Sequence, residues 1–592
     1  MSFKESVNNA VEEDRMMVMG ENNHPALSLE GLGDNLVGLF FGLVRDRKEK
    51  RLIDDVRDII KKGNKNDIKN LFLIVFQTRW CRGGKGEKKL FYIMFTELIK
   101  EYFDVCCDLL ELIPMYGYWK DFRSLYLYYI ENNEINAVLF EKMNDILEKQ
   151  LRMDMLELDK TEMPKISLLA KYYGPKYTVS FKNRSTLKSR VNNDFFKELS
   201  RRIFKQNDVY SKKSVNFSEM NMRKKFVELR KLLDIPEVKM CANKWDEINF
   251  SKVTSLCLSR NNLAFLDEDK EGNIKHPDDS GRKQCRENLL SSLSKGAKGG
   301  QLYPNELVEK IIGVKKISEG VKLTVNAQWD NLLKTTKDQI KNKVLDTGKN
   351  DIDLSRCVVM SDVSGSMSGT PMNVSIGLGI MVSQLAHESF KDLVMTFDDK
   401  PVFHNLSLEN TFYKKVKKLI SAPWGNSTNF EGAMQLIIDI IERDKLKEEE
   451  IPGSLLVISD MQFNHACNGG DYVIKKRGFG WGTAYDGIKN MFHKMGERLY
   501  GHVVEPPQII FWNVRADTIG FPASANEEGV TLLSGYSPSL LKFIFSGELE
   551  EVVVEENGEK KRVRITPRET LMKILSEKAL DPVRNILDKH FK

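Results

Sequence analysis

The stretch from Leu354 to Gly369, LSRCVVMSDVSGSMSG, places one acid and two hydroxyls directly after a short apolar run. The run Cys357–Met360 has the unbroken apolar character of a strand that is buried on both faces of a parallel sheet. Asp362, Ser364 and Ser366 then follow on a glycine-containing loop. Ligands of open α/β sheets bind where the chain leaves the carboxyl ends of strands, and oxygen donors suit a hard cation such as Mg²⁺.

Two later loops carry donors of the same kind. Thr428 lies in the segment GNSTN immediately before a predicted helix, and Asp460 ends the apolar run LLVIS. The carboxyl ends of parallel strands share one edge of a sheet, so the three loops can meet there. The sequence therefore predicts a Mg²⁺ site, or a site for another hard divalent cation, at Asp362, Ser364, Ser366, Thr428 and Asp460.

Two other interpretations of this loop stay open. Serine and aspartate also form turns and helix caps, so a metal-free capped turn explains the Asp-x-Ser-x-Ser pattern as well. A serine nucleophile would need a base and an oxyanion hole. The histidines His387, His404 and His465 show no motif that would place one beside Ser364. We therefore predict no catalytic residues and a protein that is not an enzyme.

The part of the chain that carries these loops alternates between apolar runs and helical patterns. The expected strands are Cys357–Ser361, Leu393–Phe397, Val402–Asn405, Ser454–Ser459, Gln508–Asn513 and Val530–Ser534. Helices are expected near 372–389, 411–420, 430–442 and 485–498. This order predicts a doubly wound, Rossmann-type α/β domain over residues 354–546, followed by a hairpin and a C-terminal helix over 547–592.

The first half has a different pattern. Between residues 31 and 345, apolar residues recur at three- and four-residue spacing, as in Lys88–Glu101 and Asp121–Ile130. Helices with short connections predict an all-α helical-repeat array of the HEAT-like kind, although no fixed repeat length is visible. Residues 1–30 are expected to be a flexible arm, and the charged segment 346–353 a linker, so the chain is multidomain.

Several basic and aromatic residues of the helical half are candidates for contact with RNA or phosphate. The loop TRWCRGGKGEKK (78–89) is basic and glycine-rich but lacks the nucleotide P-loop pattern. Tryptophans beside lysines can stack bases, although aromatic residues at helix ends more often belong to the core. A basic helical face is likewise most often simply solvated. The candidates are Arg82, Lys85, Trp119, Lys120, Arg223, Lys224 and Lys244.

The combination of Asp362-x-Ser364-x-Ser366 with Thr428 and Asp460 resembles the metal-ion-dependent adhesion site (MIDAS) of von Willebrand factor A (vWA) domains. The resemblance implies that the serines and the threonine ligate Mg²⁺, whereas the acids often act through water. It also implies that one coordination position accepts an acidic side chain of a protein partner. Asp460 is followed by Met461, where many such domains have glycine.

The helical half carries a second resemblance, on the RGGKGE loop, the segment Tyr116–Asp121 and the segments around Arg223 and Lys244. The chain resembles a family of eukaryotes and large DNA viruses whose helical half is similar to the TROVE module of Ro ribonucleoproteins. This resemblance implies a ring or arc of helices closed by the vWA-like domain. The implied function is a Mg²⁺-dependent ligand-binding scaffold associated with structured or single-stranded RNA. A purely protein-binding assembly or structural component, including one of a viral particle, is the alternative.

The composition and net charge of the chain argue against several classes of protein. The 592 residues carry a net charge of only +6 although 29% are charged, which is unlike a dedicated nucleic-acid binder. The eight cysteines form no CxxC pair, which argues against a disulfide scaffold or zinc modules. No apolar run has the length of a secretion signal or a membrane span, so we expect a soluble, cytoplasmic protein without a membrane partner, or a virion-associated one if the source is viral.

Overall fold

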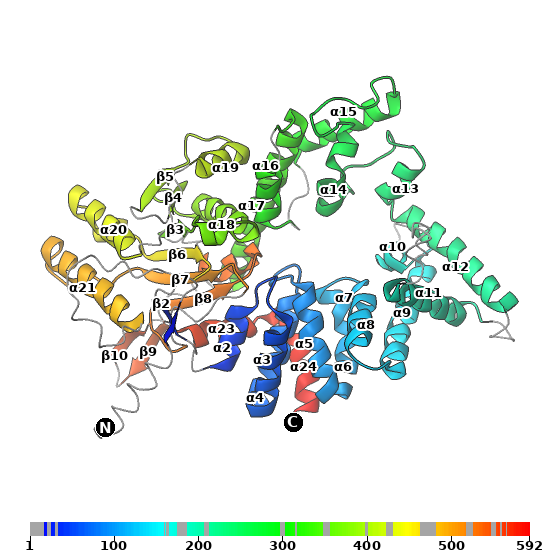
Figure 1. The fold of residues 1–592 in the computed structure, drawn as a ribbon, viewed down its shortest axis with the longest axis horizontal. Coiled ribbons are helices and arrows are strands. Elements are labelled where there is room, and N and C mark those ends of the chain that lie inside the picture. The colour runs from blue at the N-terminus through cyan, green and yellow to red at the C-terminus, as the bar shows by residue number, and fades with distance from the viewer. Residues whose placement is uncertain are drawn as a thin grey trace.

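A computed structural model describes most of the chain in two structurally different halves (Figure 1). The described residues are 17–19, 25–29, 34–158, 160, 165–173, 186–205, 212–296, 302–313, 316–346, 356–396, 401–421, 430–461, 481–516, 525–545, 552–556, 559–563 and 565–592. The first half is helical, and the second is a mixed α/β structure around a six-stranded sheet. This confirms the predicted division into an all-α part and an α/β part.

The sheet is formed by β3 (Cys357–Ser361), β4 (Leu393–Thr396), β5 (Val402–Asn405), β6 (Ser454–Ser459), β7 (Gln508–Asn513) and β8 (Val530–Ser534). Their order across the sheet is β5-β4-β3-β6-β7-β8, and only β5 runs antiparallel to its neighbour. β3, β6 and β8 are buried along their whole length, as parallel strands covered on both faces should be. The apolar runs of the sequence correspond to these strands.

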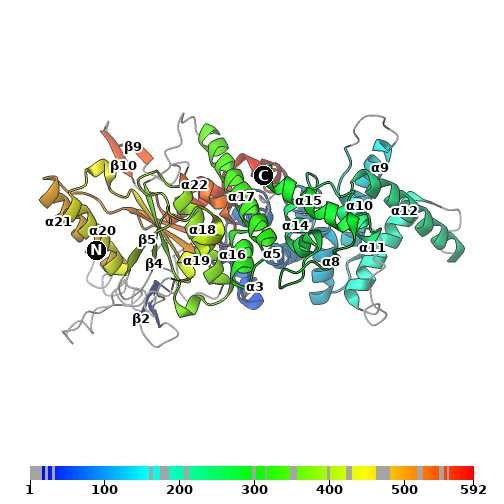
Figure 2. The same cartoon turned by 90° about the horizontal axis from the view of Figure 1, so that it is seen from above.

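Helices cover both faces of this sheet. α20 (Phe430–Asp444) and α21 (Trp481–Leu499) lie on one side, whereas α18 (Thr370–Leu385) and α19 (Phe412–Ile420) lie on the other (Figures 1 and 2). A short helix, α22 (Leu541–Phe545), follows β8. Two-sided coverage explains why the strands read as continuous apolar runs rather than alternating ones.

The helical half begins with a compact group beside the sheet (Figure 1). Its members are α2 (Asn35–Gly42), α3 (Glu49–Lys62), α4 (Lys65–Arg79), α5 (Lys88–Glu101), α6 (Phe103–Leu109), α7 (Ile113–Tyr116) and α8 (Asp121–Asn132). α4 starts with a capping box between Asn64 and Asp67, which satisfies amide groups that the helix itself leaves unpaired. α4 and α5 are buried along most of their length, and their apolar side chains belong to one core that continues into the sheet.

The remaining helices leave this group as an arc and return to the sheet (Figure 1). The outgoing helices are α9 (Ala137–Glu157), α10 (Leu169–Tyr173), α11 (Leu187–Ile203), α12 (Lys212–Leu232), α13 (Pro236–Cys241), α14 (Ser255–Leu266) and α15 (Ser280–Ser294). α14 and α15 share a separate small core around Trp245 and Phe265. α16 (Pro304–Ile312) then packs on α18, and α17 (Glu319–Asp346) packs on α19 and α22, which joins the arc to the α/β half.

The C-terminal segment also returns to the helical half. A hairpin of β9 (Val552–Glu556) and β10 (Glu559–Val563) precedes α23 (Pro567–Leu575) and α24 (Asp581–His590). α24 packs on α4 and α6, and Lys69 Nζ lies 2.7 Å from Asp588 Oδ1 across that contact. The expected single C-terminal helix is therefore two helices, and Pro582 stands in the first turn of the second, where proline favours a helix start.

Three further predictions concern the N-terminal arm, the linker between the halves and the absence of a membrane span. In the arm over residues 1–30, β1 (Met17–Met19) pairs antiparallel with β2 (Pro25–Leu29), so part of the arm forms a small sheet. α17 continues to Asp346, and the rest of the predicted linker, residues 347–353, lies outside the described residues. Among the helices that the structure describes, none combines the length and apolar character needed to span a membrane.

Candidate metal centre

The predicted acids follow two neighbouring strands at the point where the chain changes direction across the sheet. From β3 the chain continues to β4 on one side, and it later returns to form β6 on the other side of β3. Asp362 follows β3 and Asp460 follows β6, and Asp362 N donates to Ile458 O at 2.9 Å. Open α/β sheets bind ligands at such a switch point, so both acids stand at the expected place.

The loop after β3 is held by its own oxygens. Ser364 N donates to Asp362 Oδ1 at 2.9 Å, and Ser459 Oγ donates to Asp362 Oδ2 at 2.7 Å. The Oγ atoms of Ser364 and Ser366 are 3.0 Å apart. Gly369, with φ of 91°, provides the left-handed turn that leads into α18. Three of the five predicted ligands are therefore brought together by this loop.

The two acids are deeply buried and of the same charge. Asp362 and Asp460 both have no exposed surface, whereas Ser366, on the loop after β3, is exposed. Burial and then the charge of Asp460 raise the pKa of Asp362 to about 6, against the opposing effect of its hydrogen bonds from Ser459 and Ser364. Two buried carboxylates are costly unless a positive charge compensates them.

Arg515 is a residue of this site that the sequence did not single out. It follows β7, and its Nη1 lies 3.3 Å from Asp460 Oδ2 and donates to Ser366 O at 2.7 Å. The guanidinium thus connects the β3 loop with the acid after β6. Its position two residues beyond the end of an apolar strand on the same sheet edge was the signal that could have identified it.

Met461, the residue after Asp460, has φ of 64°. A left-handed backbone costs a residue with a side chain roughly 1–2 kcal/mol, which a glycine avoids. Here the methionine side chain is fully buried, and Met461 N donates to Ser459 Oγ at 3.1 Å. Core packing therefore offsets a conformation for which glycine is better suited.

Thr428 is the fifth predicted ligand, and a glycine-rich insertion at residues 467–482 follows Asp460 shortly afterwards in the sequence. Thr428 lies outside the described residues, as does the insertion up to residue 480. Within the described residues, no group of three or more His, Cys, Asp or Glu side chains is placed to hold a metal. The predicted site has only two acids, and its other ligands are hydroxyls. It is therefore not a group of three or more His, Cys, Asp or Glu side chains.

The donors present fit a hard divalent cation. The buried pair Asp362 and Asp460 carries up to two negative charges, and Arg515, whose side chain is 31% exposed, is the cation that contacts one of them. The hydroxyls of Ser364 and Ser366 lie beside the first acid. Such a set of oxygens around two buried acids suits Mg²⁺, whereas a metal-free turn would need no second buried acid.

Lys85, a predicted phosphate contact, is a buried structural residue instead. Its side chain is fully buried, and Nζ donates to Phe40 O at 2.6 Å, to Leu43 O at 3.2 Å and to Ser534 Oγ. Burial lowers the pKa of Lys85 well below its ordinary value, although the charge of Glu87 opposes this. The prediction of a phosphate contact does not fit this burial, because the ammonium instead joins α2 to β8.

The segment Tyr116–Asp121 also has a structural role. Asp121 and Arg79 are both fully buried, and Asp121 Oδ2 accepts from Arg79 Nε at 2.9 Å and from Tyr118 N at 2.7 Å. A Cβ on Gly117 would lie 2.2 Å from the same oxygen, so glycine is required there. Trp119 is partly buried against the core, with its ring 6.4 Å from that of Phe122.

The other predicted RNA contacts are scattered over the helical half. Arg82 and Lys224 are exposed. Arg223 is paired with Glu219 at 2.7 Å on α12, and Lys244 is paired with Glu247 at 2.7 Å. Trp245 is in the core of α14 and α15 rather than on the surface, with Arg282 over its ring at 3.5 Å. Arg223 and Lys224 lie on α12, whereas Lys244 and Trp245 lie between α13 and α14.

Lys120, by contrast, lies in a crowded group of positive charges. Burial and then Lys88 lower the pKa of Lys120 to about 8, with Arg260 and Arg79 acting in the same direction and Asp121 opposing them. Its Nζ lies 5.1 Å from the centre of the Tyr118 ring. A lysine without a carboxylate contact among the described residues is unusual at a half-buried position.

This pKa predicts a specific pH dependence of stability. Between pH 8 and 10.5 the unfolded chain binds more protons at Lys120 than the folded one, so the residue's penalty is present below pH 8 and is lost as pH rises. Lys120→Gln should therefore stabilise the protein at pH 7 by about 1 kcal/mol or less, after allowance for solvent screening. Thermal unfolding in buffer without phosphate or sulfate measures this, and an equal gain at pH 7 and pH 10 would contradict it.

Comparisons with known proteins divide the chain in a similar way. Residues 356–584 match the model of a domain of unknown function, DUF7788, and residues 127–341 match that of another, DUF2828. The chain is also similar to a protein of Acanthamoeba polyphaga mimivirus that is described as uncharacterised. The two are 28% identical over 562 residues, which cover 91% of this chain and 85% of the relative. No solved structure matches the chain significantly.

Proposed function

We propose that the protein is a Mg²⁺-dependent ligand-binding scaffold, in which a vWA-like domain binds its partner through a metal and a TROVE-like helical arc supports it. The observation that carries this proposal is the buried pair Asp362 and Asp460 at the switch point of the sheet, beside the hydroxyls of Ser364 and Ser366. These residues, with Thr428, would hold the ion. The ion would supply an open position for a partner's carboxylate.

Calorimetric titration with Mg²⁺ tests the site. Wild type should bind the ion, and Asp362→Asn should lose the binding heat because one of the two buried charges is gone. Without Mg²⁺, Asp362→Asn should be at least as stable as wild type, since it removes repulsion with Asp460. Saturating Mg²⁺ should then stabilise only wild type, by about 2.7 kcal/mol at a hundredfold excess over Kd.

Asp439→Ala is a matched control for this experiment. Asp439 is exposed on α20 in the same half and accepts a hydrogen bond from Gln435 Nε2 at 2.6 Å. Its variant should bind Mg²⁺ like wild type. Equal binding heats in wild type and Asp362→Asn would eliminate the proposed site, and leave Arg515 as the internal counter-ion of Asp460.

The partner proposed for the metal is a protein that presents an acidic side chain. Capture of partners from the source cell with Mg²⁺, and again with a chelator, measures whether binding depends on the ion. A partner of the proposed kind is retained by wild type only with Mg²⁺ and is lost by Asp362→Asn under both conditions. Retention that ignores the chelator would contradict a metal-mediated contact.

Between RNA association and a protein-binding component without RNA contact, the placement of the predicted RNA residues favours the second. Lys85 is buried, and Arg223 and Lys244 already pair with glutamates. Titration of a mixed RNA pool at several salt concentrations separates the two, because phosphate contacts produce a steep salt dependence. Retention of RNA at low salt that falls steeply with added salt would restore the RNA interpretation.

A further inference from the structure

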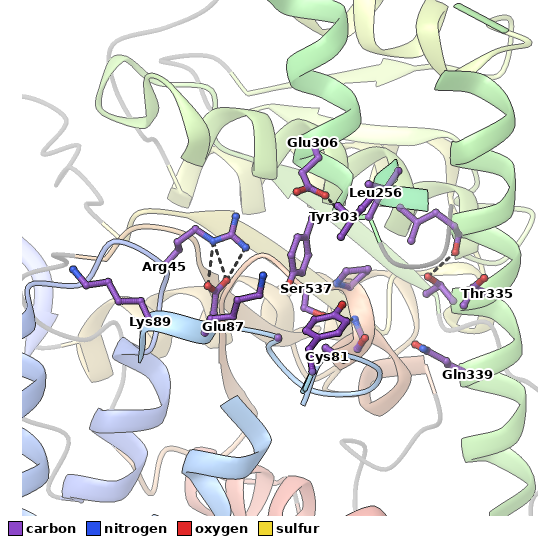
Figure 3. A pocket seen from close by; sticks show the side chains of 18 of the residues that line it. Arg45, Cys81, Glu87, Lys89, Leu256, Tyr303, Glu306, Thr335, Gln339 and Ser537 are labelled. Atoms are coloured by element: carbon purple, nitrogen blue, oxygen red, sulfur yellow. Dashed lines mark hydrogen bonds and ion pairs between the residues drawn. The ribbon is translucent and has the colours of Figure 1, made fainter. Parts of the chain in front are cut away.

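A pocket of about 320 Å³ lies where the helical arc, the first helical group and the α/β half meet. Its walls come from the start of α5, the residue Tyr118, helices α14, α16 and α17, and the segment after β8. In Figure 3, side chains from these separate elements, among them Tyr303, Thr335 and Ser537, surround a common space. Its volume is that of a pocket for a small molecule.

The walls of this pocket carry more positive than negative charge. The basic residues are Arg45, Lys88, Lys89 and Arg260, and the acidic ones are Glu87 and Glu306. Both acids already have partners. Glu87 forms a bidentate pair with Arg45 at 3.0 and 3.1 Å, and Glu306 Oε2 accepts from Tyr303 N at 3.0 Å.

Two basic residues of the walls, Lys88 and Arg260, form no ion pair among the described residues, and neither does Lys120, which lies next to the wall residue Tyr118. The Nζ atoms of Lys88 and Lys120 lie 5.7 and 5.1 Å from the centre of the same Tyr118 ring. Arg260 belongs to α14 and lowers the pKa of both lysines, after the larger effects of burial and of other cations, whereas the buried Asp121, which is paired with Arg79, raises both. Like charges held together in this way are unfavourable without an anion.

We propose that this pocket binds a small molecule through its phosphate group, which lies among Lys88, Lys120 and Arg260. A dianionic phosphate neutralises several cations at once and accepts hydrogen bonds from each of them. The neighbouring hydroxyls of Thr335 and Ser537 provide further polar contacts on the pocket wall. Because the walls belong to both halves of the chain, the ligand would join the arc to the α/β half.

Inorganic pyrophosphate is the probe for a calorimetric test, in low salt and with a chelator so that no metal contributes. Wild type should bind it, and Lys88→Gln and Arg260→Gln should each weaken binding about tenfold or more. Lys62→Gln is the matched control, because Lys62 lies on α3 outside the walls of this pocket, is 68% exposed and pairs with Asp58 at 3.1 Å. Its dissociation constant should stay within about twofold of wild type.

Two variants separate loss of the phosphate site from misfolding and from loss of the metal site. Arg260 is exposed, so Arg260→Gln should fold even if Lys88→Gln does not. Asp362→Asn should bind pyrophosphate like wild type, so failure of the metal site and failure of the phosphate site give different results. Absence of binding by wild type at millimolar pyrophosphate, or equal binding by wild type and both variants, would overturn the proposal.

The source of the phosphate is addressed by competition. A nucleoside monophosphate should displace pyrophosphate from wild type, whereas the corresponding nucleoside should not. A 5′-phosphorylated oligoribonucleotide that binds at least tenfold more tightly than pyrophosphate, and depends on Lys88, would overturn the assignment to a small molecule. Weak displacement by the oligoribonucleotide supports it.

Discussion

Replacing Asp121 with alanine is expected to lower the free energy of unfolding by about 3–5 kcal/mol, because it leaves the fully buried Arg79 without its counter-charge. Asp121 accepts hydrogen bonds from Arg79, from Tyr92 OH at 2.8 Å and from Tyr118 N. Loss of the carboxylate thus disconnects α4, α5 and the turn before α8 together. Chemical denaturation followed by circular dichroism measures the effect.

The double variant Arg79→Met with Asp121→Leu should cost less than Asp121→Ala alone, since no unpaired charge remains buried. Glu228→Ala is the surface control. It breaks the pair of Glu228 with Lys225, whose side chains are 48% and 38% exposed, and should leave the unfolding midpoint nearly unchanged. An unfolding midpoint of Asp121→Ala equal to that of wild type would show that the buried pair does not hold these helices together.

Lys85→Ala should have an effect of similar size, about 3–5 kcal/mol, at the contact between the halves. The substitution removes a fully buried side chain and leaves Phe40 O, Leu43 O and Ser534 Oγ without the donor they share. Lys85→Met preserves most of the apolar volume, so it should cost less than the alanine variant. Hydrogen exchange in β8 measures whether the effect lies at this contact.

Lys89→Ala is the control for Lys85, because it removes a lysine of the same segment that is mostly exposed. Amides of Val530–Ser534 should exchange faster in Lys85→Ala and at the wild-type rate in Lys89→Ala. If β8 exchanges equally in all three proteins, the lysine does not stabilise the docking of α2 on the sheet. A larger loss in Lys85→Met than in Lys85→Ala would show that packing is not part of its role.

The sequence predicted the elements of this fold well and their packing poorly. All six strands of the sheet and the helix Lys88–Glu101 lie where the apolar patterns place them, because burial of a face is encoded locally. Which face of a helix or strand packs against which other element is not encoded locally. Lys85 was a candidate for contact with RNA or phosphate, yet it is fully buried, since its acceptors are supplied by residues 42 to 449 positions away.

The residues of the candidate metal site could likewise be predicted from the sequence only in part. Asp362, Ser364 and Ser366 are neighbours in sequence, and their placement after β3 follows from the strand alone. Arg515 reaches Asp460 from a strand end 55 residues later, and only the order of strands in the sheet brings the two together. The same holds for Lys88 and Arg260, which belong to different helices and meet because the arc returns to its start.

The docking of α24 on α4 and α6 has a consequence during synthesis. Phe591 covers Phe72 and Tyr102, with ring centres 6.2 and 5.7 Å apart, and 519 residues separate Lys69 from its partner Asp588. At about 5–20 residues per second, a ribosome needs roughly 25–100 s to add that length. The apolar surface of the first helices is therefore exposed on the nascent chain for that time, and a chaperone that binds it would be displaced only when α24 emerges.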